Sequence, residues 1–471
     1  MKETMLPNVS DRHFFVRASD FLLLDSDVEK GGGTDQTAEV QAILDKAREW
    51  GGLYFLLDGP VLVSRLTIHS NTTIHCLDRH CGFFQKEGTN NTLLQNDRLS
   101  FEKIDTENVT LLGGTYNFNA PNQEKFDRPL EEINNGAFYG ASPDFDKAAA
   151  FHAFRHLNMG IKFCGIRNLT VRDIRMVDQR TYAMFVACFE HVLIQDVVSD
   201  LPNIMTSQNQ DGLHFQGPGR DLVIRNIRGS SGDDFLALAP DEFDFESSIT
   251  DVMIDGVYLE NADQGIRLLS RHHGRLDRVT IRNVTGTYKS FGFFIHPWYG
   301  WEAGEGEGNY GSLVFENIDL TQTYHKYNYT TPFLFRLGGR IESLTLRNIR
   351  HFHPNDTRPV VEVGRYYCHK PDESYAQIDR LVIDGLDILR DVETTEPMDY
   401  ITVDGAVRQM VVRNVRAACK GGEKKDTLVR LESGADIGTL VMSDVLTDGV
   451  GVLDRDGGSV KRVCLGQIQE D

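Results

Sequence analysis

The chain has 471 residues, of which 40% are hydrophobic and 43 are glycine, so its length allows two or three ordinary domains or one large repetitive domain. Its formal net charge of −20 argues against a nucleic-acid partner, because phosphate backbones require a basic surface. Seven cysteines without C-x-x-C spacing predict reduced thiols and argue against a disulfide framework or a zinc site.

The N-terminal stretch MKETMLPNVSDRHFFVRAS has no apolar segment of the kind found in secretory signals. No stretch of the sequence approaches the roughly 18 apolar residues that a membrane helix needs. We therefore expect a cytoplasmic protein without a membrane partner, or a secreted one if a leader has been removed.

Residues 31–52 predict a capped amphipathic helix. In GGGTDQTAEVQAILDKAREWGG, Asp35 or Thr34 is suited to the N-cap, and apolar residues follow at helical spacing. Such a helix would cover the open end of a core built from strands, where unpaired strand edges would otherwise be exposed.

Strand-like segments follow at residues 61–74 and 108–116. Residues 117–160 then break the pattern and predict a long loop or lid. The later part of the chain, from residue 169, is built on a repeat.

The repeat is a six-residue pattern: apolar, any, apolar, any, Asn/Asp/Gly, apolar. Its ten copies, from LTVRDI (169–174) to LVMSDV (440–445), are spaced 23 to 37 residues apart. Period-two alternation predicts a short strand in each copy, and a period of this length indicates stacked repeats. The fifth positions are Asp173, Asp196, Asn226, Gly256, Asn283, Asn317, Asn348, Gly385, Asn414 and Asp444. These residue types tolerate a left-handed backbone, so we expect a sharp bend at the same point of every coil.

This repeat unit favours a parallel β-helix. A helical solenoid would need two helices in each repeat, and the blades of a β-propeller need about 40 residues or more. We predict an all-β fold, a single-stranded right-handed parallel β-helix with an N-terminal capping helix. One domain would span residues 1–471, with the N-terminal segment and capping helix at 1–52 and the coils at 53–465.

The only pair of adjacent aspartates, Asp233 and Asp234, begins a segment that otherwise has the composition of a buried strand. Aligning neighbouring coils puts Asp211 and Asp233 at equivalent positions, with Asp234 beside them and Tyr182 and Gln264 in the same column. Three like charges in one patch repel, so at least one pKa should rise, a cost that proteins accept at functional sites. The alternative is that each Asp occupies an ordinary turn.

Carboxylates in this arrangement suit glycoside hydrolysis. One protonated carboxyl donates a proton to the leaving oxygen, while one or two carboxylates activate water on the opposite face of the sugar. Inverting enzymes hold the acid and the base about 6.5 to 9.5 Å apart to leave room for that water. We expect neither a cofactor nor a bound metal.

At these residues the sequence resembles glycoside hydrolase family 28, the polygalacturonase and rhamnogalacturonase family of pectin-lyase-like β-helix proteins. NQDG (209–212) looks like the family's NTDG, and GDD (232–234) matches its paired aspartates at similar spacing. The resemblance implies that Asp233 is the general acid and that Asp211 and Asp234 activate water in an inverting mechanism on a pectic or related saccharide. Dextranase-like β-helix hydrolases are similar at these positions, so the motif indicates the reaction class better than the sugar.

The sequence departs from this family in the following coils. The family's Gly-His-Gly is replaced by ADQGIR, which offers Gln264 and no histidine. Its Arg-Ile-Lys, which binds the substrate carboxylate, is replaced by a strand that ends in His296. Alternatively, GIRLL (265–269) is that strand with one coil deleted, so that Arg267 keeps the arginine's role. Either way the cation pair is incomplete, which predicts a glycoside other than polygalacturonate.

Several residues near the aspartates are candidate substrate contacts. His214 would face the cleft or simply be exposed, and Arg267 would bind substrate or form an ion pair with Asp234. Tryptophans of the loop at 296–311 would pack on sugar rings or only within the loop. The candidates are His214, Gln264, Arg267, His273, His296, Trp298 and Trp301.

Two other functions fit the same residues. A β-helix polysaccharide lyase would use the aspartates to bind calcium. A non-catalytic carbohydrate-binding β-helix would keep its affinity after the aspartates are neutralised. The sequence leaves open the sugar, the linkage, endo or exo action and the oligomeric state.

Overall fold

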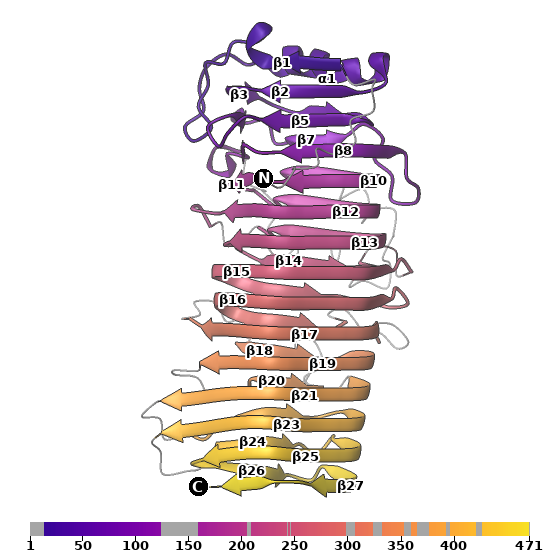
Figure 1. Ribbon diagram of the computed structural model, residues 1–471, viewed down its shortest axis with the longest axis vertical. Helices are drawn as coiled ribbons and strands as arrows, with labels where there is room; N and C mark the ends of the chain where they lie inside the picture. Colours follow the sequence, from indigo (N-terminus) through magenta and orange to yellow (C-terminus); the bar gives the residue numbers. More distant parts are fainter. Residues whose placement is uncertain are drawn as a thin grey trace, which may run out of the picture.

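The computed structural model describes residues 14–123, 159–204, 209–242, 244, 246–297, 307–323, 332–352, 359–364, 376–391, 396–420 and 426–470. About 65% of the described residues are in strands and 5% in helices. The strands form a single-stranded right-handed parallel β-helix whose coils stack along the long axis of the molecule (Figure 1). The predicted fold class is confirmed, whereas most of the predicted loop or lid at 117–160 lies outside the described residues.

The N-terminal coils use short strands and contain the helices. The strands are β1 (Phe14–Arg17), β2 (Leu53–Leu57), β3 (Pro60–Val63), β4 (Leu66–Ile68), β5 (Thr72–Cys76), β6 (Gly82–Gln85), β7 (Leu94–Asn96), β8 (Thr106–Leu112) and β9 (Thr115–Asn117). The helices are α1 (Thr37–Trp50) and the 3₁₀ turns η1 (Ala18–Asp20) and η2 (Ala120–Asn122).

The later coils use longer strands that bend through the repeat positions. They are β10 (Ile161–Arg172), β11 (Arg175–Val177), β12 (Met184–Asp200), β13 (Leu213–Gly229), β14 (Asp234–Ala239), β15 (Ile249–Leu268), β16 (Leu276–Ile295), β17 (Asn309–Gln322), β18 (Phe333–Leu337), β19 (Gly339–Phe352), β20 (Val361–Val363), β21 (Ala376–Asp391), β22 (Asp399–Val403), β23 (Ala406–Lys420), β24 (Asp426–Leu431), β25 (Asp436–Asp448), β26 (Val450–Arg455), β27 (Ser459–Leu465) and β28 (Ile468–Glu470). Every one of these strands pairs in parallel with a strand of a neighbouring coil.

The parallel register stacks like residues above one another. One ladder faces the apolar core and contains Met184, Leu213, Leu236, Ile266, Phe293, Phe335 and Val361. The next residue of each strand belongs to a second ladder that alternation turns away from the core. This second ladder, here called the site column, contains Phe185, His214, Ala237, Arg267, Phe294, Arg336 and Glu362. No disulfide joins the described cysteines, so packing and hydrogen bonds hold these coils together.

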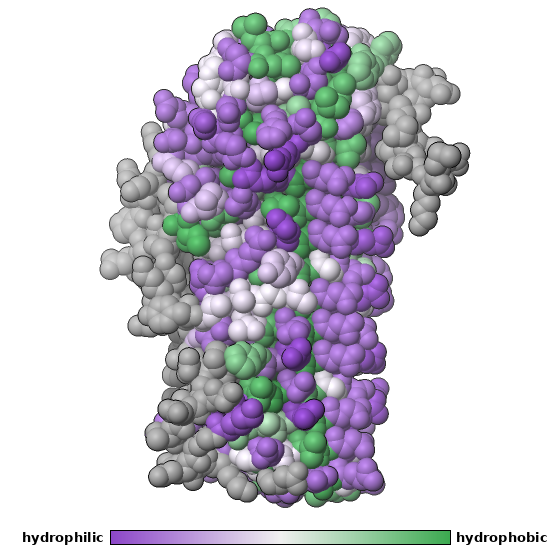
Figure 2. All heavy atoms as spheres, turned by 60° about the vertical axis from the view of Figure 1, so that its left-hand side comes forward, coloured by the Kyte–Doolittle hydropathy of each residue, from purple (hydrophilic) through white to green (hydrophobic). Residues whose placement is uncertain are grey.

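The predicted bend is present at all ten repeat positions, each of which has a positive φ between 50° and 85°. Side-chain amides also bridge successive coils: Asn348 Nδ2 donates to Asn317 Oδ1 at 3.0 Å, and Asn317 Nδ2 donates to Asn283 Oδ1 at 3.0 Å. Because polar residues recur at matching positions of successive coils, hydrophilic side chains stack in columns along the molecule (Figure 2).

Helix α1 lies within the segment predicted to be helical, beside β2 near the N-terminal end of the solenoid (Figure 1). Its apolar face, including Leu44, joins the core. The predicted N-cap was wrong: the cap position is Gln36, because Asp35 still bridges to Leu62 and its side chain accepts from the Thr37 amide. The role of α1 in closing the core stays a prediction. No helix in the described ranges is both long and apolar enough to cross a membrane.

We expect Asn317→Ala to lower the free energy of unfolding by about 1 to 3 kcal/mol, because alanine is strained at φ 57° and breaks the amide ladder. Asn317→Gly should cost less, since glycine relieves the strain and loses only the ladder bonds. Denaturant unfolding followed by circular dichroism measures both. Equal stability of the alanine variant and the wild type would contradict this account of the bend.

Candidate active site

The three aspartates meet where the chain enters β13 and β14, beside the His214 and Arg267 members of the site column. The Gly212 amide donates to the Asp234 carbonyl at 2.9 Å, and Asp234 pairs in register with Gln264. Asp234, not Asp233, therefore lies level with Asp211, and the sequence alignment was wrong by one residue. The alignment failed because Phe235 and Leu236 are adjacent and both join the core, so alternation could not identify the inward position.

Asp211 is buried and belongs to a chain of three polar side chains. His214 Nδ1 lies 2.9 Å from Asp211 Oδ2, and His214 Nε2 lies 3.1 Å from Glu242 Oε2. Burial opposes the charge on His214, but its bonds to the two carboxylates prevail and raise its pKa to about 10. Burial also raises the pKa of Asp211 to about 7, although the bond to His214 lowers it.

Asp234 is paired with Arg267. Arg267 Nε donates to Asp234 Oδ2 at 2.6 Å, and its Nη2 donates to Gln264 Oε1 at 2.7 Å. The guanidinium also lies over the rings of Phe291 and Phe294, with 5.2 and 5.0 Å to their centroids. Burial raises the pKa of Asp234, and Arg267 opposes that shift. Asp234 Oδ1 is buried and accepts no hydrogen bond within the described part of the chain.

Asp233 differs from its two neighbours in the surroundings of its carboxyl. Its side chain is half-buried, and among the described residues no cation or hydrogen-bond donor pairs with its carboxyl. Burial raises its pKa well above the ordinary value and repulsion from Asp211 and Asp234 adds to the shift, while the nearby charge of Arg267 opposes it. The site therefore holds one carboxyl, that of Asp233, whose protonated form is favoured, beside the carboxyls of Asp211 and Asp234, which have cationic partners.

The other candidate contacts fall into different places. His296 is buried in the coil after Arg267, where burial and the charges of Arg336 and Arg267 lower its pKa to about 3. His273 is exposed on the turn after β15, and its ring stacks on that of His272 with ring centroids 3.8 Å apart. Among the described residues, no contact joins it to the three aspartates. Trp298 and Trp301 lie outside the described residues.

Sequence reasoning missed two acidic residues at this site. Glu242 follows β14 in the turn PDE, which lies outside the repeat. In the sequence, the acidic residues that directly follow the strand of Asp234 are the one feature that could have indicated it. Asp263 precedes Gln264 and accepts from Ser290 Oγ at 3.2 Å, and burial raises its pKa to about 6. Within the described ranges, no group of His, Cys, Asp and Glu is arranged to hold a metal ion.

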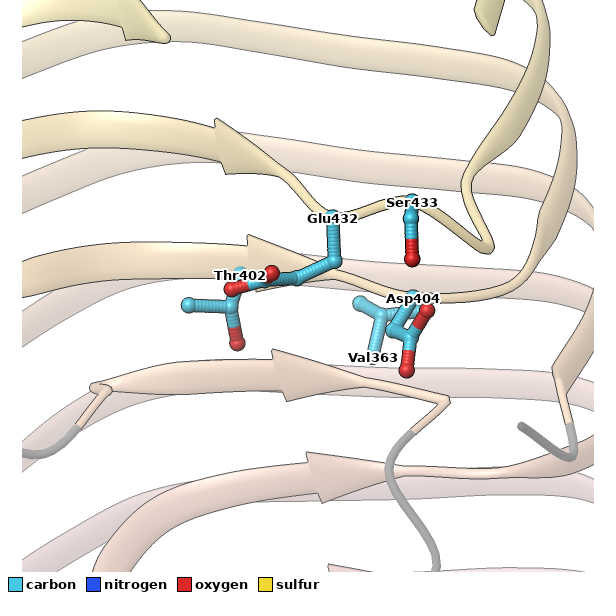
Figure 3. Close-up of a pocket in the computed structure, with 5 residues that line it drawn as sticks. All are labelled: Val363, Thr402, Asp404, Glu432 and Ser433. Atoms are coloured by element: carbon cyan, nitrogen blue, oxygen red, sulfur yellow. The ribbon is translucent and has the colours of Figure 1, made fainter. Parts of the chain in front are cut away.

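A small pocket of about 70 Å³ lies farther along the solenoid, between the ends of β22 and β24 (Figure 3). Its lining is mostly polar and comes from Val363, Thr402, Asp404, Glu432 and Ser433. None of these residues contacts the three aspartates, so the pocket is separate from the candidate site.

Comparison with family models finds no match. A search of curated proteins finds no relative. Among solved structures, the tailspike protein of E. coli bacteriophage HK620, in complex with a pentasaccharide, is 12% identical with a TM-score of 0.56, covering 94% of this chain and 80% of that one. This likeness shows a shared β-helix fold and nothing finer.

Two exopolygalacturonases are also similar. The enzyme from Thermotoga maritima is 13% identical with a TM-score of 0.47, covering 98% of this chain and 93% of that one. The family 28 enzyme from Yersinia enterocolitica is 11% identical with a TM-score of 0.45, covering 98% of this chain and 79% of that one.

Replacing Arg267 by Met should lower the free energy of unfolding at neutral pH by about 3 to 5 kcal/mol, because it leaves the Asp234 carboxylate buried without its cation. The pKa of Asp234 in the folded state would rise further above its unfolded value. The loss of unfolding free energy should therefore be smallest below about pH 4, where Asp234 is protonated in both the folded and the unfolded state. It should grow as the pH rises.

Thermal unfolding midpoints at low and neutral pH test this, with Arg267→Lys as the control that keeps a cation. A loss of the same size at both pH values would show that packing, rather than charge compensation, is what Arg267 provides.

Proposed function

We propose that this protein is a glycoside hydrolase whose acid and base are supplied by Asp233, Asp211 and Asp234. The observation that carries the proposal is the unequal environment of three neighbouring carboxyls. Asp211 and Asp234 each have a cationic partner, and Asp233 has none within the described residues. Such a division separates a proton donor from proton acceptors, as glycoside hydrolysis requires.

In this mechanism, Asp233 gives its proton to the glycosidic oxygen as the bond to the anomeric carbon breaks. Asp211 or Asp234 accepts a proton from the water that attacks the same carbon. Two carboxylates on the water side and one acid on the other favour direct displacement with inversion. Exchange with solvent then returns the proton to Asp233 and removes it from the base.

The proposed substrate is an oligosaccharide or polysaccharide related to pectin, and the charges favour a glycoside without a uronate at the cleaved position. Arg267 is committed to Asp234, and the low pKa of His296 leaves its ring uncharged near neutrality. The pentasaccharide complex of the HK620 tailspike shows that a protein of this fold can hold a carbohydrate. The aspartate motifs add support through their resemblance to family 28.

We expect wild-type protein to hydrolyse at least one member of a panel of neutral and pectic oligosaccharides, and Asp233→Asn to lower kcat by about 10² to 10⁴-fold, because an amide cannot act as the acid. Asp319→Asn, an exposed change on a distant coil, should leave kcat unchanged. Product analysis by chromatography and by NMR of the released anomer measures both rate and stereochemistry.

The same assay with EDTA separates this function from its rivals. Activity lost in EDTA, with unsaturated products that absorb ultraviolet light, would identify a calcium-dependent lyase. Saccharide binding without turnover that survives Asp233→Asn would identify a carbohydrate-binding protein.

A further inference from the structure

We propose that His214 and Glu242 are positioning residues that orient Asp211 as the water-activating base and keep a positive charge beside it. This inference rests on the proposed function. Both ring nitrogens of His214 face carboxylate oxygens, at 2.9 Å from Asp211 and 3.1 Å from Glu242. A neutral imidazole has a single N–H and can donate to only one of them, whereas an imidazolium donates to both.

The ring of His214 is held in one orientation by packing as well as by its hydrogen bonds. Tyr182 stacks on it with ring centroids 4.4 Å apart and an angle of 4° between the planes. Phe185, its neighbour in the site column, lies 5.7 Å away on the preceding coil. Asp211, His214 and Glu242 are all at least nine-tenths buried, so bulk solvent competes little with the two carboxylates for the ring nitrogens.

Glu242 is fixed in turn by the chain that follows β15. Its carbonyl accepts from Arg271 Nη1 at 2.8 Å. The adjacent Asp241 accepts the amides of Arg271 and His272 at 2.6 Å each and that of Gly274 at 3.0 Å. The chain after β15 therefore fixes the turn that carries Glu242, and the Glu242 carboxylate faces His214 on β13. A residue with no place in the repeat thus reaches the catalytic patch.

The charged groups around His214 determine how its positive charge affects the protonation of Asp211. Asp211 and Glu242 contact the ring, and Asp234 acts on it from the neighbouring strand while paired with Arg267. Among the strongest influences of the described residues on Asp211, burial, Asp234 and Glu242 favour its protonated form, and His214 favours the carboxylate. Without the imidazolium, Asp211 would keep its proton near neutral pH and could not accept one from water. His214 is therefore assigned to Asp211 and not to the substrate.

The experiment compares pH profiles of kcat and KM for wild type, His214→Gln, Glu242→Gln and the double variant. His214→Gln keeps a donor but removes the charge, so kcat at pH 7 should fall at least about tenfold and the acid limb should move up by about one pH unit or more, with KM nearly unchanged. Exposed Glu260→Gln, which removes a surface charge paired with Arg228, is the control and should change neither kcat nor the profile.

The double variant tests whether Glu242 acts through His214. Glu242→Gln should lower kcat in the wild type and have less than about a twofold effect in the His214→Gln background. Additive losses with an unshifted acid limb would mean that both residues merely support the fold, and would overturn the proposal.

NMR of the His214 ring gives a readout that needs no turnover. We expect both ring nitrogens to be protonated up to about pH 9 in the wild type, and the ring to titrate at lower pH in Glu242→Gln. Titration near the ordinary histidine value in an active enzyme would overturn the inference alone. A high-titrating ring in a protein that hydrolyses no saccharide would instead refute the proposed function, and with it the role assigned to Asp211.

Discussion

The parallel hydrogen-bond register between successive coils is the constraint on which the rest of this structure depends. Each coil repeats the backbone of the last at a spacing of about 4.8 Å, so a residue's neighbours across coils are set by its place in the register. A shift of one residue would turn a core side chain outward and a polar one inward. The left-handed bends at the ten repeat positions help to prevent such shifts, because only Asn, Asp and Gly stand there.

That register also brings distant charges together and decides how they are compensated. Asp211 and Asp234 come from successive coils, and each meets a cation from its own strand or the next: His214 for the first and Arg267 for the second. Buried carboxylates are costly unless they are paired. The column continues with Arg336 against Glu362, both buried and 2.6 Å apart, so a further buried ion pair lies on the same face. Asp233 stands out because its coil provides it with no such partner among the described residues.

How far the site could be predicted depended on whether its parts lay inside the repeat. Aligning the coils predicts one patch that contains Asp211, Asp234, Gln264 and Arg267. The alignment errs in placing Asp233, instead of Asp234, level with Asp211. Two adjacent apolar residues made the inward position ambiguous, and only backbone hydrogen bonds resolved it. Glu242 could not be placed, because it lies in a turn whose path is set by contacts with another coil.

The amino-acid sequence by itself determined the all-β repeat, its bends and the approximate neighbourhood of the carboxylates. These follow from local rules: alternation specifies strands, and Asn, Asp and Gly specify left-handed turns. The tertiary structure alone decided that His214 lies between two carboxylates, and it placed Arg267 in the ion pair with Asp234, one of the two roles that the sequence had left open. Those pairings depend on the direction in which side chains point across coils and on their burial. Burial raises the free-energy cost of every unpaired charge, and neither direction nor burial can be read from spacing along the chain.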